Sequence, residues 1–231
     1  MFSDSIFLGL KHLPLFNIPF SRNGLFTGQQ EILEVIHKNL VTKARSDRTS
    51  SYVLYGLGGV GKTQIAIEYS YRHQADFDII YWLRADDYDT LLRSYLQLYN
   101  DPSFKAFSSL NLGDENNLEI VAKWIKSWFE NCQDITWLLI VDNADNLETI
   151  FDQKIKIIAS LIPKDRGGYV LITNRNKFVC GQLAIIGQEL DVMDKDNVKE
   201  FLFKCSQAAF DESEDVDLLV ESLGRFPLAI E

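Results

Sequence analysis

The stretch Gly56-Leu-Gly-Gly-Val-Gly-Lys-Thr63 decides the fold of this chain. Its spacing matches G-x-x-x-x-G-K-[ST], the loop that cradles the phosphates of a nucleoside triphosphate. A β-prone run, Ser51–Tyr55, precedes it, and Gln64–Ser70 follows with helical spacing. This context fits, because the backbone N–H groups of the loop and of a helix N-terminus must converge on one anion. The sequence therefore predicts a nucleotide-binding protein.

The loop also assigns roles to single residues. Lys62 is expected to reach the β- and γ-phosphates, and the Thr63 hydroxyl is expected to bind Mg²⁺. The predicted nucleotide contacts of this segment are Gly56, Gly58, Gly59, Val60, Gly61, Lys62, Thr63 and Gln64.

Composition narrows the class of protein. The chain has 231 residues, of which 46% are hydrophobic, and its formal net charge is -10. This charge argues against a nucleic-acid-binding surface. Three cysteines, far apart and odd in number, favour reduced thiols in a cytoplasmic protein rather than a disulfide scaffold or a structural zinc site. No run approaches the roughly 20 apolar residues of a membrane span, so we expect no membrane partner.

Hydrophobic periodicity predicts an α/β fold. The expected strands cover 51–55, 78–83, 136–141, 168–173 and, with a weaker pattern, 183–190. Helical spacing covers 27–40, 64–73, 89–99, 117–129, 147–161, 196–206 and 214–223, and 100–113 is expected to be a loop because of Pro102. Thr27 and Gln30 have the spacing of a capping box. The alternation of strands and helices predicts a three-layer sandwich with a parallel five-stranded sheet.

Three segments follow from this pattern. Residues 1–25 are expected to be an irregular or partly extended lead-in, 26–190 the nucleotide-binding domain, and 191–231 a partial helical subdomain. The sequence stops within a helical pattern, which we interpret as a subdomain cut short.

Two further residues are expected at the carboxyl edge of the sheet, where ligands bind. Asp142 follows the apolar run 136–141 and is the candidate Mg²⁺ carboxylate. Asn143 comes next and cannot act as a base, which predicts slow hydrolysis. The sequence leaves open whether Asp145 points inward. Arg175, after the fourth strand, is expected to sense the γ-phosphate. Lys62, Asp142 and Arg175 are thus the candidate catalytic residues.

Together these motifs resemble the NB-ARC family of STAND-class signalling NTPases, in particular fungal NOD-like receptors. The resemblance rests on 56–63, on 78–83, on Trp137–Asp145, on Val170–Arg175 and on the Gly-x-Pro-like segment Gly224–Ile230, in the family's order. It implies that Pro227 packs against adenine and that Phe26 and Thr27 lie in a segment that wraps the base. Gln29 departs from the arginine usual in that segment. The family's winged-helix domain is not in the sequence.

The resemblance implies a signalling switch of innate immunity that binds ADP or ATP with Mg²⁺. ADP would hold a closed monomer, and ATP would permit self-oligomerisation together with other domains of a longer receptor. At most a slow ATPase is expected. Two alternatives remain at this point: a catalytic P-loop ATPase or small-molecule kinase, and a scaffold that has lost nucleotide binding.

Overall fold

The computed structural model describes residues 14–42, 48–108, 117–147, 158–180, 183–184, 186–207 and 214–230. A six-stranded parallel sheet forms the centre, in the order β1-β3-β4-β5-β2-β6. Its strands are β1 (Leu15–Asn17), β2 (Ser50–Tyr55), β3 (Ile79–Arg84), β4 (Trp137–Asp142), β5 (Tyr169–Asn174) and β6 (Ile186–Glu189). Continuous burial of β4 follows from its uninterrupted apolar sequence, since helices cover both faces of a parallel sheet.

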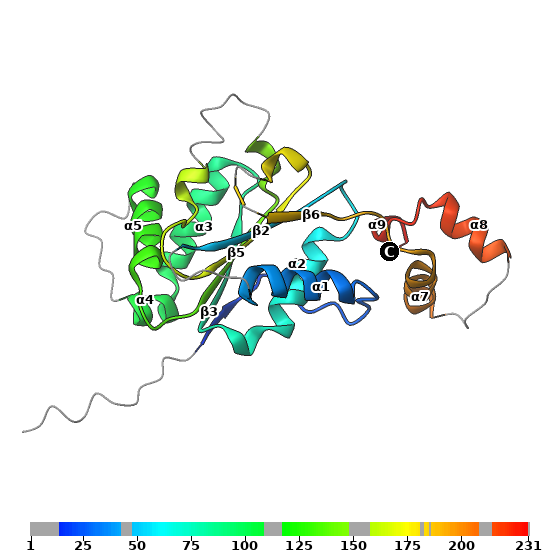
Figure 1. Cartoon of the computed structure of the whole chain (residues 1–231), viewed down its shortest axis with the longest axis horizontal. Helices are drawn as coiled ribbons and strands as arrows, with labels where there is room; N and C mark the ends of the chain where they lie inside the picture. Colours follow the sequence, from blue (N-terminus) through cyan, green and yellow to red (C-terminus); the bar gives the residue numbers. More distant parts are fainter. Residues whose placement is uncertain are drawn as a thin grey trace, which may run out of the picture.

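Helices cover both faces, as the sequence predicts (Figure 1). One hydrophobic core lies between the sheet and α3 (Tyr88–Asn100), α4 (Pro102–Ser108) and α5 (Leu118–Asn131). A second core lies under α1 (Gln30–His37) and α2 (Lys62–Arg72). The three-layer α/β fold is confirmed. None of the described helices is long and apolar enough to cross a lipid bilayer.

A smaller group of helices follows the sheet. It contains α7 (Lys195–Ser206), α8 (Glu214–Ser222) and the short α9 (Pro227–Ile230). Met193, Val198, Phe201 and Val220 form its own apolar cluster. Figure 1 shows these helices beside the end of the sheet from which the glycine loop emerges, and the Leu228 N–H lies 3.5 Å from the Gly59 carbonyl oxygen.

The structure corrects three predictions. The sheet has six strands rather than five, because Leu15–Asn17 pairs with the edge of β3. Residues 102–108, predicted as a loop, form α4, with Pro102 in its first turn and Asp101 accepting from the Ser103 N–H at 2.8 Å. Proline suits this position, because the first helical residues have no partner for their N–H groups.

The predicted capping box is also wrong. The Thr27 hydroxyl donates to the Leu25 carbonyl at 2.8 Å, and α1 begins after Gln29, which has a left-handed backbone and no side-chain cap. Most of the helix predicted at 147–161 lies outside the described residues, although 158–161 is helical.

Candidate functional site

The glycine loop joins the carboxyl end of β2 to the N-terminus of α2. Its backbone requires glycine at Gly56, where φ is +143° and an added Cβ would lie 2.3 Å from the Leu190 carbonyl oxygen. No side chain of the described residues caps α2, whose N-cap is Gly61. The first N–H groups of this helix therefore face the loop, which is the arrangement that binds a phosphate.

Lys62 lies inside this loop. Its ammonium donates to the carbonyl oxygens of Gly56 and Leu57, both at 2.8 Å. Burial lowers the pKa of Lys62, while Asp145 and Asp142 act in the opposite direction. The charge that is expected to meet phosphate oxygens is thus already held over the loop.

Asp142 lies at the end of β4 and is 8% exposed. Its Oδ1 atom accepts from the Thr63 hydroxyl at 3.0 Å and from the Thr173 hydroxyl at 2.6 Å. Burial raises the pKa of Asp142, although these two hydrogen bonds work against the rise. A carboxylate and a hydroxyl are oxygen ligands of the kind that Mg²⁺ prefers, so Thr63 and Asp142 fit the predicted metal role.

The two polar residues that follow Asp142, Asn143 and Asp145, have different partners. Asn143 has a left-handed backbone (φ 63°), its N–H donates to Thr173 Oγ1 at 2.9 Å, and its amide donates to Asp86. Asp145 instead forms an ion pair with Arg175, with 2.9 Å between Oδ2 and Nε. The question that the sequence left open has an answer: the Asp145 carboxylate is engaged by the arginine.

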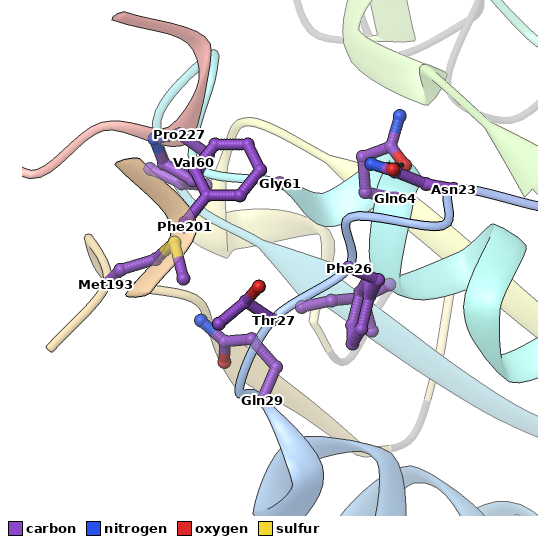
Figure 2. Close-up of a pocket in the computed structure, with 11 residues that line it drawn as sticks. Asn23, Phe26, Thr27, Gln29, Val60, Gly61, Gln64, Met193, Phe201 and Pro227 are labelled. Carbon is purple, nitrogen blue, oxygen red and sulfur yellow. Dashed lines mark hydrogen bonds between the residues drawn. The ribbon is translucent and has the colours of Figure 1, made fainter. Parts of the chain in front are cut away.

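Two cavities meet at the loop. The first, of about 220 Å³, is lined by Gly58, Gly59, Gly61, Lys62, Thr63, Gln64, Asn143, Thr173, Arg175, Pro227 and Leu228. The second, of about 60 Å³, is lined by Asn23, Phe26, Thr27, Gln29, Val60, Gly61, Gln64, Ile65, Met193, Phe201 and Pro227 (Figure 2). Gly61, Gln64 and Pro227 line both cavities, so the two adjoin one another at the glycine loop.

The second cavity brings together three segments that are distant in the sequence. Figure 2 shows Phe26 and Thr27 on one side, and Met193, Phe201 and Pro227 on the other. Lys204 of α7 donates to the Thr27 hydroxyl at 3.0 Å, which ties α7 to the N-terminal segment. The cavity has an apolar lining and a few amides, which suits a flat heterocycle such as a nucleotide base.

The structure thus places every predicted site residue around one site. Phe26, Thr27, Val60, Gln64 and Pro227 line the second cavity, which we call the base-side cavity after its expected ligand. Arg175 lines the first, which we call the phosphate cavity, and lies over Gly58, where an added Cβ would be 3.5 Å from the guanidinium carbon. Sequence reasoning missed Asp86, Thr173, Met193, Phe201 and Lys204. A signal was present for Thr173, because it ends a predicted strand.

No family model matches the chain. A nucleotide-binding leucine-rich repeat (NLR)-like protein of Hyaloscypha variabilis is 25% identical over 229 residues, which cover 93% of this chain and 22% of that protein. The chain therefore spans about a fifth of the length of this curated relative.

Solved structures share the fold. The Cdc6p protein of Pyrobaculum aerophilum superposes with a TM-score of 0.62 at 14% identity, covering 92% of this chain and 62% of the other. A signal-transduction ATPase of the STAND type from Pyrococcus horikoshii, with a tetratricopeptide-repeat sensor, gives 0.53 at 18% identity, covering 91% and 30%. The solved structures show the fold of P-loop NTPases, and the motifs in their order, the geometry of the loop and the NLR-like relative support a nucleotide-binding P-loop module.

Proposed function

We propose that this chain is the ADP/ATP-binding switch of a longer signalling receptor of innate immunity in the cytoplasm. The observation that carries the proposal is that the base-side cavity is lined by the N-terminal segment, the glycine loop and the helical part together. A nucleotide bound there would contact all three segments. Whether ADP or ATP is bound would then change the position of the helical part relative to the loop, because Pro227 and Leu228 of the helical part lie beside the loop glycines.

A nucleotide shifts such an equilibrium only by its differential affinity for the two states. The groups available for this difference are Lys62 and Arg175, which line the phosphate cavity. Both can donate charge-assisted hydrogen bonds to a γ-phosphate that ADP lacks. Thr63 and Asp142 would hold Mg²⁺, which neutralises phosphate charge when bound.

The surroundings of Asn143 support slow hydrolysis. A general base must come within hydrogen-bond reach of the attacking water, and Asn143 has no basic group. Asp145 is held by Arg175, and Asp86 accepts from the Asn143 amide and from Arg84 Nε at 3.1 Å. Slow turnover suits a switch, in which the bound nucleotide must outlast the signal.

Partners follow from the same proposal. ATP in place of ADP would release the helical part and permit self-oligomerisation, while other domains of the receptor supply the trigger and the output. The net charge of -10 gives no support to a nucleic-acid partner.

The test is the nucleotide that the purified protein carries, read by mass spectrometry, followed by titration with ADP and Mg-ATP. We expect about one nucleotide per chain and loss of binding in Lys62→Ala. Lys123→Ala, on the exposed face of α5, is the matched control. Full retention of affinity in Lys62→Ala would refute the site.

A catalytic ATPase or kinase is the second candidate, and the carboxylate of Asp86 beside Asn143 is the observation that favours it. Turnover of about 1 s⁻¹ or faster, usual for kinases, together with its loss in Asp86→Asn, would establish that candidate over the switch.

A further inference from the structure

Two side-chain amides connect the N-terminal segment to the first turn of α2, where the two cavities adjoin. The Leu25 backbone N–H donates to Asn23 Oδ1 at 2.9 Å, and Asn23 Nδ2 donates to Gln64 Oε1 at 3.3 Å. Gln64 is the third residue of α2 and lines both the base-side cavity and the phosphate cavity. Figure 2 shows the side chains of Asn23 and Gln64 close together. The N-terminal segment thus contacts a side chain of the candidate nucleotide site.

These two hydrogen bonds fix the orientation of both amides. A backbone N–H can only donate, so the Asn23 atom that meets it must be the oxygen. The nitrogen of Asn23 can also only donate, so it must face the oxygen of Gln64 rather than the nitrogen. The Nε2 group of Gln64 has two N–H donors, and the described part of the chain provides no acceptor for them. Gln64 therefore offers free donors where the two cavities adjoin.

An ion pair holds Asn23 beside Gln64. Arg22, the residue before Asn23, donates to the carboxylate of Glu68 at 2.7 and 3.0 Å. Glu68 lies four residues after Gln64, so the two side chains are neighbours on one face of α2. Two adjacent residues of the N-terminal segment thus contact two residues that lie one turn apart on the helix. This double contact restricts where Asn23 can move relative to Gln64.

We propose that Asn23 is a positioning residue, which turns the Gln64 amide so that its Nε2 group donates to an α-phosphate oxygen of the bound nucleotide. The inference rests on the proposed ADP/ATP-binding function. A nucleotide that spans the two cavities has its ribose and α-phosphate between the base and the β-phosphate, and Gln64 lines both cavities. A ribose hydroxyl both donates and accepts, whereas a phosphate oxygen accepts and carries charge. The phosphate oxygen is the better match for a pure donor, because a charged acceptor strengthens the hydrogen bond.

Titration of the chain with ADP in the presence of EDTA tests the proposal. Gln64→Leu removes the donor and should weaken ADP binding about 10- to 100-fold, as expected for a hydrogen bond to a charged group. Asn23→Asp should weaken it by a similar factor, because a carboxylate accepts from Gln64 Nε2 and leaves Oε1 facing the phosphate. Asn131→Asp makes the same change at an exposed position of α5 and should leave the affinity unchanged.

A double variant separates the positioning effect of Asn23 from the effect of added charge. If Asn23 acts through Gln64, then Asn23→Asp should weaken ADP binding less than about threefold once Gln64 is replaced by leucine, since contacting residues are not additive. An equally large loss in both backgrounds would show that the new charge alone repels ADP, and it would overturn the positioning role.

ADP with sulfur in place of one α-phosphate oxygen identifies the group that Gln64 contacts. Sulfur is a weaker acceptor than oxygen, so the loss of Gln64 should change the ratio of affinities for the two diastereomers of this analogue. We expect the same change in Asn23→Asp. An unchanged ratio in Gln64→Leu would overturn the α-phosphate contact. A wild-type chain that binds no nucleotide would overturn the proposed function as well, whereas ADP binding that neither single variant weakens would overturn this inference alone.

Discussion

Arg175 and Asp145 are joined twice at the edge of the phosphate cavity. The guanidinium Nε lies 2.9 Å from Asp145 Oδ2, and the Arg175 backbone N–H donates to Oδ1 at 2.7 Å. The arginine that is proposed to sense the γ-phosphate is thus already bound to a carboxylate. A nucleotide must compete with this carboxylate for the guanidinium.

Asp145→Asn should therefore favour ATP over ADP. Asparagine keeps an oxygen for the Arg175 N–H but removes the charge that holds the guanidinium. An exposed ion pair is worth ~0.2–1 kcal/mol, so the ratio of ATP to ADP affinity should rise up to roughly fivefold. Titration of both nucleotides in the presence of Mg²⁺ measures the ratio, with Asp191→Asn as the control. An equal change in both affinities would mean that Arg175 does not discriminate between them.

Asp142→Asn should stabilise the protein while it removes Mg²⁺-dependent nucleotide binding. Burial holds the pKa of Asp142 above its ordinary value of 3.8, so ionisation in the folded state costs free energy at neutral pH. Asparagine can still accept from Thr63 and Thr173 without that charge. We expect a gain of roughly 0.5–2 kcal/mol in the free energy of unfolding, the range of single stabilising substitutions.

The pH dependence of this gain checks its cause. Because the folded pKa is raised, the wild-type chain loses stability as the pH rises through that pKa. The gain from Asp142→Asn should thus be full at pH 7 and shrink as the pH falls toward 3.8. Thermal unfolding without nucleotide or Mg²⁺ measures it. A gain of the same size at every pH would assign it to something other than the charge.

Gly168 should be far less tolerant of alanine than its neighbour Gly167. Both have left-handed backbones, with φ of +71° and +58°, but an added Cβ at Gly168 would lie 2.0 Å from the Trp137 ring, whereas at Gly167 it would meet nothing within 4 Å. The shared backbone strain costs about 1–2 kcal/mol, and the clash adds about 1–3 kcal/mol for Gly168→Ala alone. Urea unfolding of the two variants measures the difference, and equal losses would contradict the clash.

Residues of the candidate site could be predicted from the sequence where they belong to a single local motif. Lys62 and Thr63 follow from the loop, and Asp142 follows an apolar run that has the length and composition of a covered strand. The place of Thr173 at a strand end could be predicted, but its contact with Asp142 could not, because that contact depends on the register of β5 against β4, which the local sequence does not contain. The base side needs Met193 and Phe201, which reach the cavity only through packing of the helical part.

For the fold, too, features set by local sequence could be predicted and features set by distant contacts could not. The helical and apolar patterns predict the three layers, but β1 exists only through its pairing with β3, which is distant in the chain. Pro102, which predicts a loop, lies instead in the first turn of α4, a position at which proline is over-represented. At Thr27 a local hydrogen bond to Leu25 replaced the cap that the spacing predicts.

Glu68 connects the N-terminal segment to the loop helix, and its loss should affect both stability and nucleotide binding. Its carboxylate, only 4% exposed, accepts from Arg22 at 2.7 and 3.0 Å and from Arg72 at 2.6 Å. Burial alone would raise the pKa of Glu68, but these arginines outweigh burial and hold it below its ordinary value. The ion pairs thus stabilise the protein above about pH 4.5, and their contribution is lost as the pH falls through the lowered pKa.

We therefore expect Glu68→Gln to lower the free energy of unfolding at pH 7 by about 1.5–3 kcal/mol, the range for hydrogen bonds to a charged group. The deficit should shrink in acid, where the wild-type carboxylate is protonated as well. Because Arg22 precedes Asn23 and Phe26 of the base-side cavity, the variant should also bind ADP more weakly at temperatures where it remains folded. Urea unfolding and ADP titration measure the two effects. Glu31→Gln, at an exposed position of α1, should change neither, and a Glu68→Gln that behaves like this control would show that the arginines do not hold the N-terminal segment in place.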